Sequence, residues 1–233
     1  MKRILLKISG EAFQGTSDRW LDLIASRQVA ALIQNVRDQG KEIAIVVWGG
    51  NIYRGTKLIE AGLNPADSHN MSVLSTVFNA MTLKNVLAEL DIESVILDAL
   101  HIEFLEAYTS HKWKKYLEKG KVVILSSGIG VPYFSTDTAG IIRALELRCE
   151  AVIKLTKVDG VYDKDPLKHS SAVRFDEISY DDFLQQNLKV FDHTGIILAR
   201  DNEIPLYVSQ LRDMKTLSSI LFSGTGGTKI CKK

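Results

Sequence analysis

The sequence predicts an α/β protein, a three-layer αβα sandwich around a mostly parallel sheet. Short apolar runs alternate with amphipathic segments, and several runs end in loops that contain glycine. Runs of this kind are typical of strands buried on both faces, as in parallel sheets. At 233 residues with 45% hydrophobic side chains and no Pro/Gly-rich linker, we expect a single domain spanning residues 1–233.

The first predicted unit is a strand over Arg3–Ile8 followed by a helix. Lys7 stands at the end of this strand, where the chain reads Lys7-Ile8-Ser9-Gly10. Ligands of open parallel sheets bind beyond the carboxyl ends of the strands, so Lys7 is expected to overlook a ligand pocket. The alternative is a solvated lysine at a strand end. The helix is predicted from apolar residues at i, i+3, i+4 and i+7 and a closing glycine: Val29, Leu32, Ile33, Val36 and Gly40.

A second strand over Ile43–Val47 leads into Gly49-Gly50, with Arg54 four residues later. Paired glycines let backbone amides approach a phosphate, and the arginine fork suits phosphate oxygens. A hairpin is disfavoured because a helix over residues 68–90 follows. That helix is predicted from Leu74, Val77, Phe78 and Met81, and we expect Phe78 and the methionines to be core residues rather than a cofactor pocket.

A third strand is predicted over Ser94–Leu97 and a helix over Phe104–Lys119, whose lysine-rich side we expect to be a solvated face. The fourth strand, Val122–Leu125, ends in a loop of small residues over 126–132. A cluster of helix-capping residues at 135–138 then precedes the apolar stripe of Ile141, Ile142 and Leu145. Strand, glycine loop and helix N-terminus together suit a phosphate; the alternative is an ordinary strand-to-helix turn.

The last third of the chain continues the alternation. A strand over Ala151–Leu155 runs into a loop at 156–166, whose aromatic residue and carboxylates suit a base and a ribose. The spacing of Asp159, Asp163 and Asp165 excludes an EF-hand. The remaining predicted elements are a helix over Asp192–Arg200, a strand over Leu206–Val208, a helix over Met214–Leu221 and a strand over Thr228–Cys231.

Composition narrows the function to small soluble substrates. The net charge is +1, and no Lys/Arg run is interleaved with aromatic residues, so we expect no nucleic-acid partner. Cys149 and Cys231 lie far apart without metal-ligand spacing, which fits a reducing cytosol and no protein-held metal. The apolar run at the N-terminus is too short for a signal peptide, and no segment is long enough to span a membrane. We therefore expect a cytoplasmic protein.

Five stretches of the chain carry a joint resemblance, and there is no GxxxxGK[ST] motif of a P-loop kinase. They are Lys7-Ile8-Ser9-Gly10-Glu11-Ala12, Gly49-Gly50-Asn51-Ile52-Tyr53-Arg54-Gly55, Pro132-Tyr133-Phe134-Ser135-Thr136-Asp137, Lys157-Val158-Asp159-Gly160-Val161-Tyr162 and Asp165-Pro166. Together these stretches resemble the amino acid kinase family over nearly the whole chain. The chain is most similar to the bacterial members that phosphorylate UMP.

The resemblance implies a transfer of the γ-phosphoryl group of ATP to UMP, giving UDP. It also implies a homohexamer and an allosteric, cytoplasmic enzyme of pyrimidine biosynthesis. Mg²⁺ is expected to be held mainly by ATP oxygens and water, because phosphoryl transfer needs charge neutralisation more than a protein cage. Lys7 is the first catalytic candidate, Asp137 is expected to orient it, and Arg54 is expected beside the phosphates.

The resemblance also assigns the nucleotide contacts residue by residue. ATP is expected to contact Lys7, Ile8, Ser9, Gly10, Gly50, Arg54, Thr156, Tyr162 and Asp165. UMP is expected to contact Gly49, Ile129, Gly130, Val131, Pro132, Tyr133, Phe134, Ser135 and Thr136.

The chain departs from the family pattern at several positions. Trp48 stands where the family usually has a third glycine, and it either crowds the site or packs beneath it. His69 stands where the family usually has a ribose-binding Asp, with Asp67 two residues earlier; either side chain suits a ribose hydroxyl. Two alternatives stay open: another kinase of the family, and a regulatory or storage homologue that binds nucleotides with little turnover.

Overall fold

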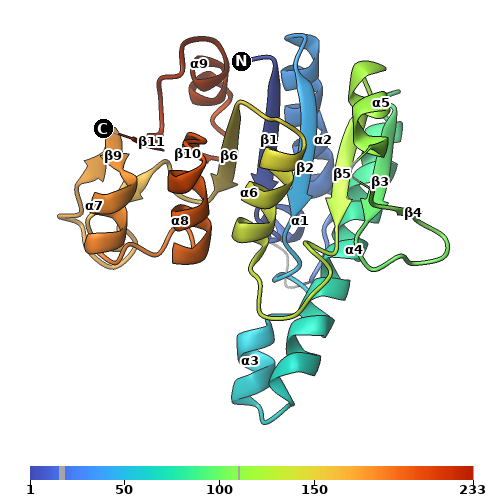
Figure 1. Cartoon of the computed structure of the whole chain (residues 1–233), viewed down its shortest axis with the longest axis horizontal. Helices are drawn as coiled ribbons and strands as arrows, with labels where there is room; N and C mark the ends of the chain where they lie inside the picture. The colour runs from blue at the N-terminus through green and yellow to red at the C-terminus, as the bar shows by residue number, and fades with distance from the viewer. Residues whose placement is uncertain (16–18, 110, 233) are drawn as a thin grey trace.

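A nine-stranded sheet lies between two layers of helices in the computed structural model, which describes residues 1–15, 19–109 and 111–232 (Figure 1). The strand order is β4-β3-β5-β2-β1-β6-β10-β11-β9. Neighbouring strands run parallel except β10 and β11. The predicted three-layer fold with a mostly parallel sheet is therefore confirmed.

The strands of this sheet are β1 Arg3–Ile8, β2 Glu42–Val47, β3 Ser94–Asp98, β4 Glu106–Ala107, β5 Val122–Ser126, β6 Ala151–Thr156, β9 Glu177–Ser179, β10 Leu206–Gln210 and β11 Thr228–Cys231. A separate ribbon is formed by β7 Val161–Tyr162 and β8 Arg174–Phe175. The helices are α1 Glu11–Gln14, α2 Leu23–Asp38, α3 Gly55–Glu60, α4 Pro65–Ala88, α5 Lys112–Glu118, α6 Thr136–Glu146, α7 Tyr180–Gln185, α8 His193–Asp201 and α9 Met214–Ser223.

Two cores form on the two faces of the sheet. The core beneath α1, α2, α4 and α9 contains Ile4, Leu6 and Ile8 of β1, whereas Leu5 belongs to the core beneath α5, α6, α7 and α8. Side chains alternate between the faces of a strand, so Lys7 points to the same face as Leu5, toward α6. On β6, the same alternation places Lys154 on this face.

The carboxyl ends of the central strands meet at one edge of the sheet, and α3 and the start of α4 project beyond it (Figure 1). Asn64 begins α4 by accepting hydrogen bonds from the amides of Ala66 and Asp67. Ser135 begins α6 in the same way, accepting from the amides of Asp137 and Thr138. These side-chain caps fix where both helices start at this edge.

One predicted helix is shorter than expected. The helix predicted over Phe104–Lys119 is confirmed only for Lys112–Glu118, because Glu106 and Ala107 form β4 and pair with β3. The Asp98 carboxylate turns the chain after β3 by accepting from the amides of Leu100 and Ile102. This turn brings the following residues alongside β3, where strand pairing prevails over the helical pattern.

The buried face of α4 also differs from the prediction. Phe78 is 55% exposed and Met81 39% exposed, so the expectation that they belong to the core is wrong. The helix packs on the sheet through Ala80, Leu83 and other small or aliphatic residues on its opposite side. The ring of Phe78 instead meets Trp20 edge to face, with 6.0 Å between centroids.

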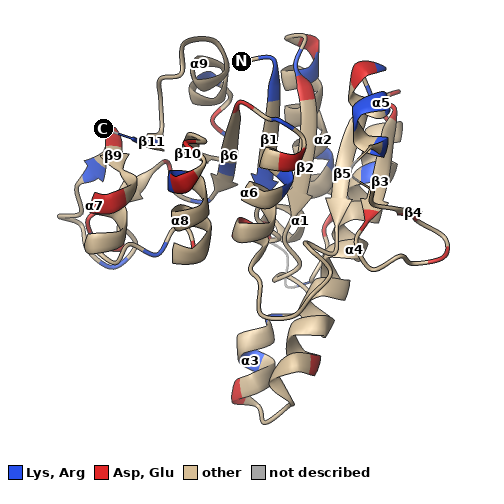
Figure 2. Cartoon of the chain, in the orientation of Figure 1, with Lys and Arg blue, Asp and Glu red and all other residues tan. Residues whose placement is uncertain are grey.

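Charged residues are spread over the molecule, and Figure 2 shows Lys and Arg interspersed with Asp and Glu over most elements. On α5, Lys114 pairs with Glu118 at 3.8 Å while both side chains stay exposed, which confirms the predicted solvated face. Among the residues that the structure describes, no helix has both the length and the hydropathy to span a bilayer.

Candidate active site

A cleft of about 520 Å³ opens at the carboxyl ends of β1, β2, β5 and β6. We call it the rim cleft; its walls include Lys7, Arg54, His69, Ser127, Tyr133 and Thr156. The site residues expected from the sequence that line it are Lys7, Ser9, Arg54, Ile129, Val131, Tyr133, Phe134, Ser135, Thr136, Asp137 and Thr156. Sequence segments more than a hundred residues apart therefore meet in one cavity.

A buried chain of charges forms the floor of the rim cleft. The ammonium of Lys7 lies 2.8 Å from Oδ1 of Asp137, and the ammonium of Lys154 lies 2.6 Å from Oδ2. Lys7 and Lys154 occupy paired positions on neighbouring strands, and their side chains are only 5% and 11% exposed. Like charges opposite each other repel, so Asp137 is needed to hold both lysines in place.

The electrostatics of this chain follow from its burial. Burial alone would raise the pKa of Asp137, but the charges of Lys7 and Lys154 hold the pKa of this carboxyl at about 2. Burial and repulsion by Lys7 lower the pKa of Lys154 to about 8. Lys154 also donates to the carbonyl oxygen of Val190. The cleft therefore contains an ionised carboxylate between two cations at neutral pH.

Arg54 adds a third cation to the wall of the cleft. Its guanidinium donates to Oε1 of Glu11 at 2.7 Å and to the carbonyl oxygen of Gly50 at 3.2 Å. The guanidinium carbon lies 5.1 Å from the Trp48 ring centroid, and the Lys7 ammonium lies 5.5 Å from it. Trp48 thus packs beside two cations, within the range of cation–π attraction, and forms part of the cleft floor.

The loop after β5 holds an unusual backbone shape. Ser127, Gly128, Gly130 and Tyr133 all have positive φ, between 57° and 83°. A Cβ on Gly130 would lie 2.9 Å from the carbonyl oxygen of Ala99, so this position requires glycine. Strained backbone that the surrounding structure holds in place is characteristic of functional sites.

Side-chain and backbone hydrogen bonds fix the start of this loop. The amide of Ser127 donates to Oγ1 of Thr76 at 2.7 Å, and the hydroxyls of Ser126 and Ser127 both donate to Oδ1 of Asp98. All four side chains are buried. The loop is therefore anchored to α4 and to β3 before it reaches the cleft.

Aromatic side chains form the outer wall of the rim cleft. Tyr133 and Phe134 are 65% and 47% exposed, and the rings of Tyr133 and His69 lie 4.7 Å apart. Such a wall suits the flat face of a nucleobase. His69 lines the cleft, whereas Asp67 is exposed outside its lining.

Several expected contact residues do not line the rim cleft: Ile8, Gly10, Gly49, Gly50, Gly130, Pro132, Tyr162 and Asp165. The strand-end glycines lie in close packing, and their nucleotide contacts stay predictions. A Cβ on Gly49 would lie 2.5 Å from Cβ of Ser75, and a Cβ on Gly10 would lie 2.4 Å from Oδ1 of Asn51. Tyr162 is in the β7 strand, where its hydroxyl donates to Asp159 at 2.7 Å.

The N-terminus of α6 is less open to an anion than the sequence suggested. The amides of Asp137 and Thr138 both donate to Oγ of Ser135 at 3.1 Å, and the amide of Thr138 also donates to Asp192. These two donors are already engaged within the protein, and a phosphate beside the glycine loop and this helix start stays a prediction. The cations of the cleft are better placed to meet an anion.

Sequence reasoning missed three residues of the site. Lys154 had a visible signal, because a lysine interrupts the apolar run of β6. Glu11 joins two cations, since its Oε1 meets Arg54 at 2.7 Å and its Oε2 meets Lys157 at 3.1 Å. Thr76 gave no local signal, because only the fold brings it to the loop after β5.

The arrangement is suited to binding and aligning negatively charged groups. Lys7, Lys154 and Arg54 place three cations around one end of the cleft, and Asp137 and Glu11 hold them in position. Prearranged cations in a largely water-excluded floor stabilise charge that develops during a reaction. Together with the aromatic wall, they fit a ligand that has phosphates at one end and a planar ring at the other.

The sequence of this chain is similar to those of known kinases. Residues 2–210 match the model of the amino acid kinase family. The uridylate kinase of Anaplasma marginale is 44% identical over 210 residues, which cover 90% of this chain and 85% of that protein. The uridylate kinase of Hyphomonas neptunium is 38% identical over 233 residues, covering 100% of this chain and 93% of that protein.

Solved structures show the same likeness. The UMP kinase from Bacillus anthracis superposes with a TM-score of 0.95 at 29% identity, covering 100% of this chain and 96% of that chain. The aspartate kinase from Synechocystis has a TM-score of 0.74 at 20% identity, covering 99% of this chain and 40% of that chain. The second likeness shows a shared fold.

Proposed function

Because the chain belongs to the amino acid kinase family, we propose that it transfers the γ-phosphoryl group of ATP to UMP, giving ADP and UDP. Two kinds of support bear on the acceptor: the similar uridylate kinases and UMP kinase, and the aromatic wall of the rim cleft. The observation that carries the chemistry is the buried Lys7–Asp137–Lys154 chain at the floor of the cleft.

In this reaction an oxygen of the UMP phosphate attacks the γ-phosphorus of ATP. A new oxygen–phosphorus bond forms, the bond between the γ-phosphorus and the β,γ-bridging oxygen breaks, and ADP leaves with the bond electrons. Two anions must approach each other, so catalysis consists largely of alignment and charge neutralisation. Lys7 and Arg54 supply that charge, and Asp137 orients Lys7 through the 2.8 Å contact.

The two nucleotides are proposed to enter from opposite sides of Lys7. ATP lies over the ends of β1 and β6, near Ser9 and Thr156, and its adenosine extends toward Tyr162 and Asp165. UMP lies along the loop of residues 129–136, with its base against Tyr133. The positions of Ser9, Thr156 and Tyr133 in the walls of the rim cleft support this arrangement.

Magnesium is proposed to arrive as part of the Mg-ATP substrate. Within the described ranges, no three His, Cys, Asp or Glu side chains gather closely enough to hold a metal ion. The cleft carboxylates Asp137 and Glu11 are each paired with two cations. We propose that the ion is held mainly by phosphate oxygens and water.

We also propose a homohexamer that acts in the cytoplasm, in pyrimidine biosynthesis, under allosteric control. The exposed stripe of Leu74, Phe78 and Met81 on α4 supports contacts between copies of the chain, because apolar residues grouped on a surface mark interaction sites. Light scattering on the purified protein measures the mass of the assembly. A monomer at micromolar concentration would contradict the hexamer without touching the proposed reaction.

A substrate panel tests the proposed reaction. ADP release is measured with Mg-ATP and UMP, CMP, N-acetylglutamate, aspartate, glutamate or carbamate as acceptor. We expect rapid turnover with UMP and none with the carboxylates or carbamate. Preference for a carboxylate would make the chain another kinase of the family, and nucleotide binding without turnover at saturating Mg-ATP would make it a regulatory homologue.

A further inference from the structure

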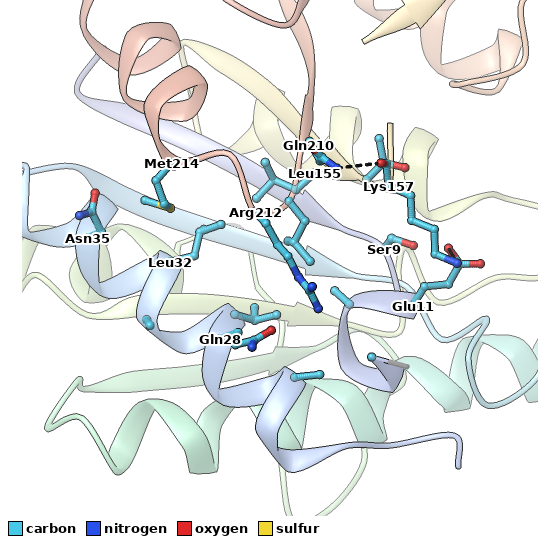
Figure 3. Close-up of a pocket in the computed structure, with 17 residues that line it drawn as sticks. Ser9, Glu11, Gln28, Leu32, Asn35, Leu155, Lys157, Gln210, Arg212 and Met214 are labelled. Carbon is cyan, nitrogen blue, oxygen red and sulfur yellow. Dashed lines mark hydrogen bonds and ion pairs between the residues drawn. The ribbon is translucent and has the colours of Figure 1, made fainter. Parts of the chain in front are cut away.

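A second cavity, of about 650 Å³, lies on the opposite side of the sheet edge from α6. We call it the α2 cavity; it is enclosed by α1, α2 and the segment from Gln210 to Met214 that joins β10 to α9 (Figure 3). Among the described lining residues, it shares Ser9, Glu11 and Thr156 with the rim cleft. None of the proposed nucleotide contacts other than Ser9 and Thr156 lines it.

The floor of the α2 cavity is apolar. Val29 and Leu32 of α2 and Leu155 of β6 are at most 5% exposed and line the cavity, and Met214 lies at its α9 end. The volume and the largely apolar lining match the sites that proteins use for small molecules. A methionine at the edge of such a site adapts readily to the shape of a ligand.

The charges around the α2 cavity leave one cation without a partner. Of the residues that the structure describes, three charged side chains line it: Glu11, Lys157 and Arg212. Glu11 and Lys157 pair with each other at 3.1 Å. No described acidic side chain pairs with Arg212, and the neighbouring carboxylate of Asp213 is engaged in capping α9.

The side chain of Arg212 points into the α2 cavity (Figure 3). Figure 3 shows its side chain crossing the cavity from the β10–α9 segment toward Gln28 on α2. A guanidinium offers a fork of donors that matches a carboxylate or a phosphate, and the Gln28 amide adds further donors on the facing wall. The cavity therefore pairs an anion-binding end with an apolar body.

We propose that the α2 cavity binds a small anionic ligand with an apolar body, a carboxylate or a phosphate monoester, whose anion meets Arg212 and whose body packs on Val29, Leu32 and Met214. Of the proposed nucleotide contacts, this site shares Ser9 and Thr156 at its border with the rim cleft. It is connected to the nucleotide contacts through Glu11, whose two carboxylate oxygens meet Lys157 beside the α2 cavity and Arg54 in the rim cleft.

Calorimetry and ligand-observed NMR on the full chain test this proposal with three probes: phenylacetate, phenyl phosphate and the neutral phenylacetamide. We expect at least one anionic probe to bind and phenylacetamide to bind at least tenfold more weakly. Whichever anion binds more tightly identifies the head group. Equal binding of the neutral probe, or no binding of either anion, would overturn the proposal.

Two variants locate the site. Arg212→Gln should weaken the binding of the anionic probe about tenfold or more, because hydrogen bonds to charged groups contribute about 1.5–3 kcal/mol. Lys215→Gln removes the same charge from an exposed position on α9 outside the cavity and should leave binding unchanged. Equal loss in both variants would show non-specific attraction instead.

Competition separates this proposal from the proposed function. Saturating UMP together with a non-hydrolysable ATP analogue should not displace the probe from the α2 cavity. Displacement would show that the probe occupies the nucleotide site and would overturn the proposal. Binding is measured without turnover, so an inactive chain that still binds the probe contradicts only the proposed reaction.

Discussion

Replacing Asp137 by Asn tests the idea that one carboxylate holds two buried lysines together. Asn has the same shape but no charge, so the ammonium groups of Lys7 and Lys154 lose the anion that now lies 2.8 and 2.6 Å away. The amide oxygen still accepts one hydrogen bond, while the amide nitrogen presents donors to the other ammonium. Both lysines then repel each other across paired strand positions.

The magnitude follows from the pKa of Asp137, which the two lysines lower from 3.8 to about 2. A protonated carboxyl is the neutral counterpart of Asn, and this decrease in pKa corresponds to roughly 2–3 kcal/mol. Breaking a buried ion pair on one side typically destabilises by about 3–5 kcal/mol. We therefore expect Asp137→Asn to lower the free energy of unfolding at pH 7 by about 2–5 kcal/mol.

The pH dependence has a definite sign. The pKa of Asp137 is lower in the folded chain than in the unfolded chain, so its stabilisation is present above pH 4 and is lost as the pH falls toward 2. The difference in unfolding free energy between wild type and Asp137→Asn should therefore narrow by about 1 kcal/mol between pH 7 and pH 3.

Urea unfolding followed by circular dichroism, at one fixed protein concentration, measures both effects. Asp176→Asn is the matched control, because that carboxylate is 90% exposed although it also pairs with a cation, Arg174. The control should change stability by less than about 0.5 kcal/mol. If Asp137→Asn is as stable as wild type at pH 7, or if its deficit grows on acidification, the reasoning is refuted.

Three further variants probe the proposed reaction. Lys7→Ala should keep the circular dichroism spectrum but lower kcat for ADP release about a hundredfold or more, because a charge-stabilising donor is lost; a near-normal kcat would reject its catalytic role. Tyr133→Ala should raise the KM for UMP about fivefold or more through lost base stacking, and an unchanged KM would remove Tyr133 from the acceptor site. Because the pKa of Lys154 is lowered to about 8, its charge is present below that pH and lost above it. Wild-type kcat should therefore fall above about pH 8, and Lys154→Met should abolish this limb of the pH profile; a variant that retains the limb would assign it to another group.

The sheet was predictable because its signals are local. The central strands are largely apolar runs, and the observed bounds of β1 and β11 equal those expected from the sequence. The error at Phe104–Lys119 has a non-local cause. The turn around Asp98 and the pairing of β4 with β3 depend on contacts that residue spacing does not encode.

The site was predictable where a residue stands at a strand end or in a recognisable stretch, as Lys7 and Arg54 do. The partners of these residues were harder to predict. Asp137 was expected to orient Lys7, and the ion pair has that geometry, but the second lysine on Asp137 follows only from the register between β1 and β6. The packing role of Gly49 could not be predicted from the sequence either, because Ser75 lies next to it only in the folded chain, where α4 packs on this loop.

The contact between Trp48 and Gly50 has a consequence for sequence variation. A Cβ on Gly50 would lie 2.2 Å from a ring carbon of Trp48, so the indole fills the space that any side chain at position 50 would need. We therefore expect the residues at positions 48 and 50 to vary together among homologues. A homologue with a larger residue at position 50 is therefore expected to have a side chain smaller than tryptophan at position 48.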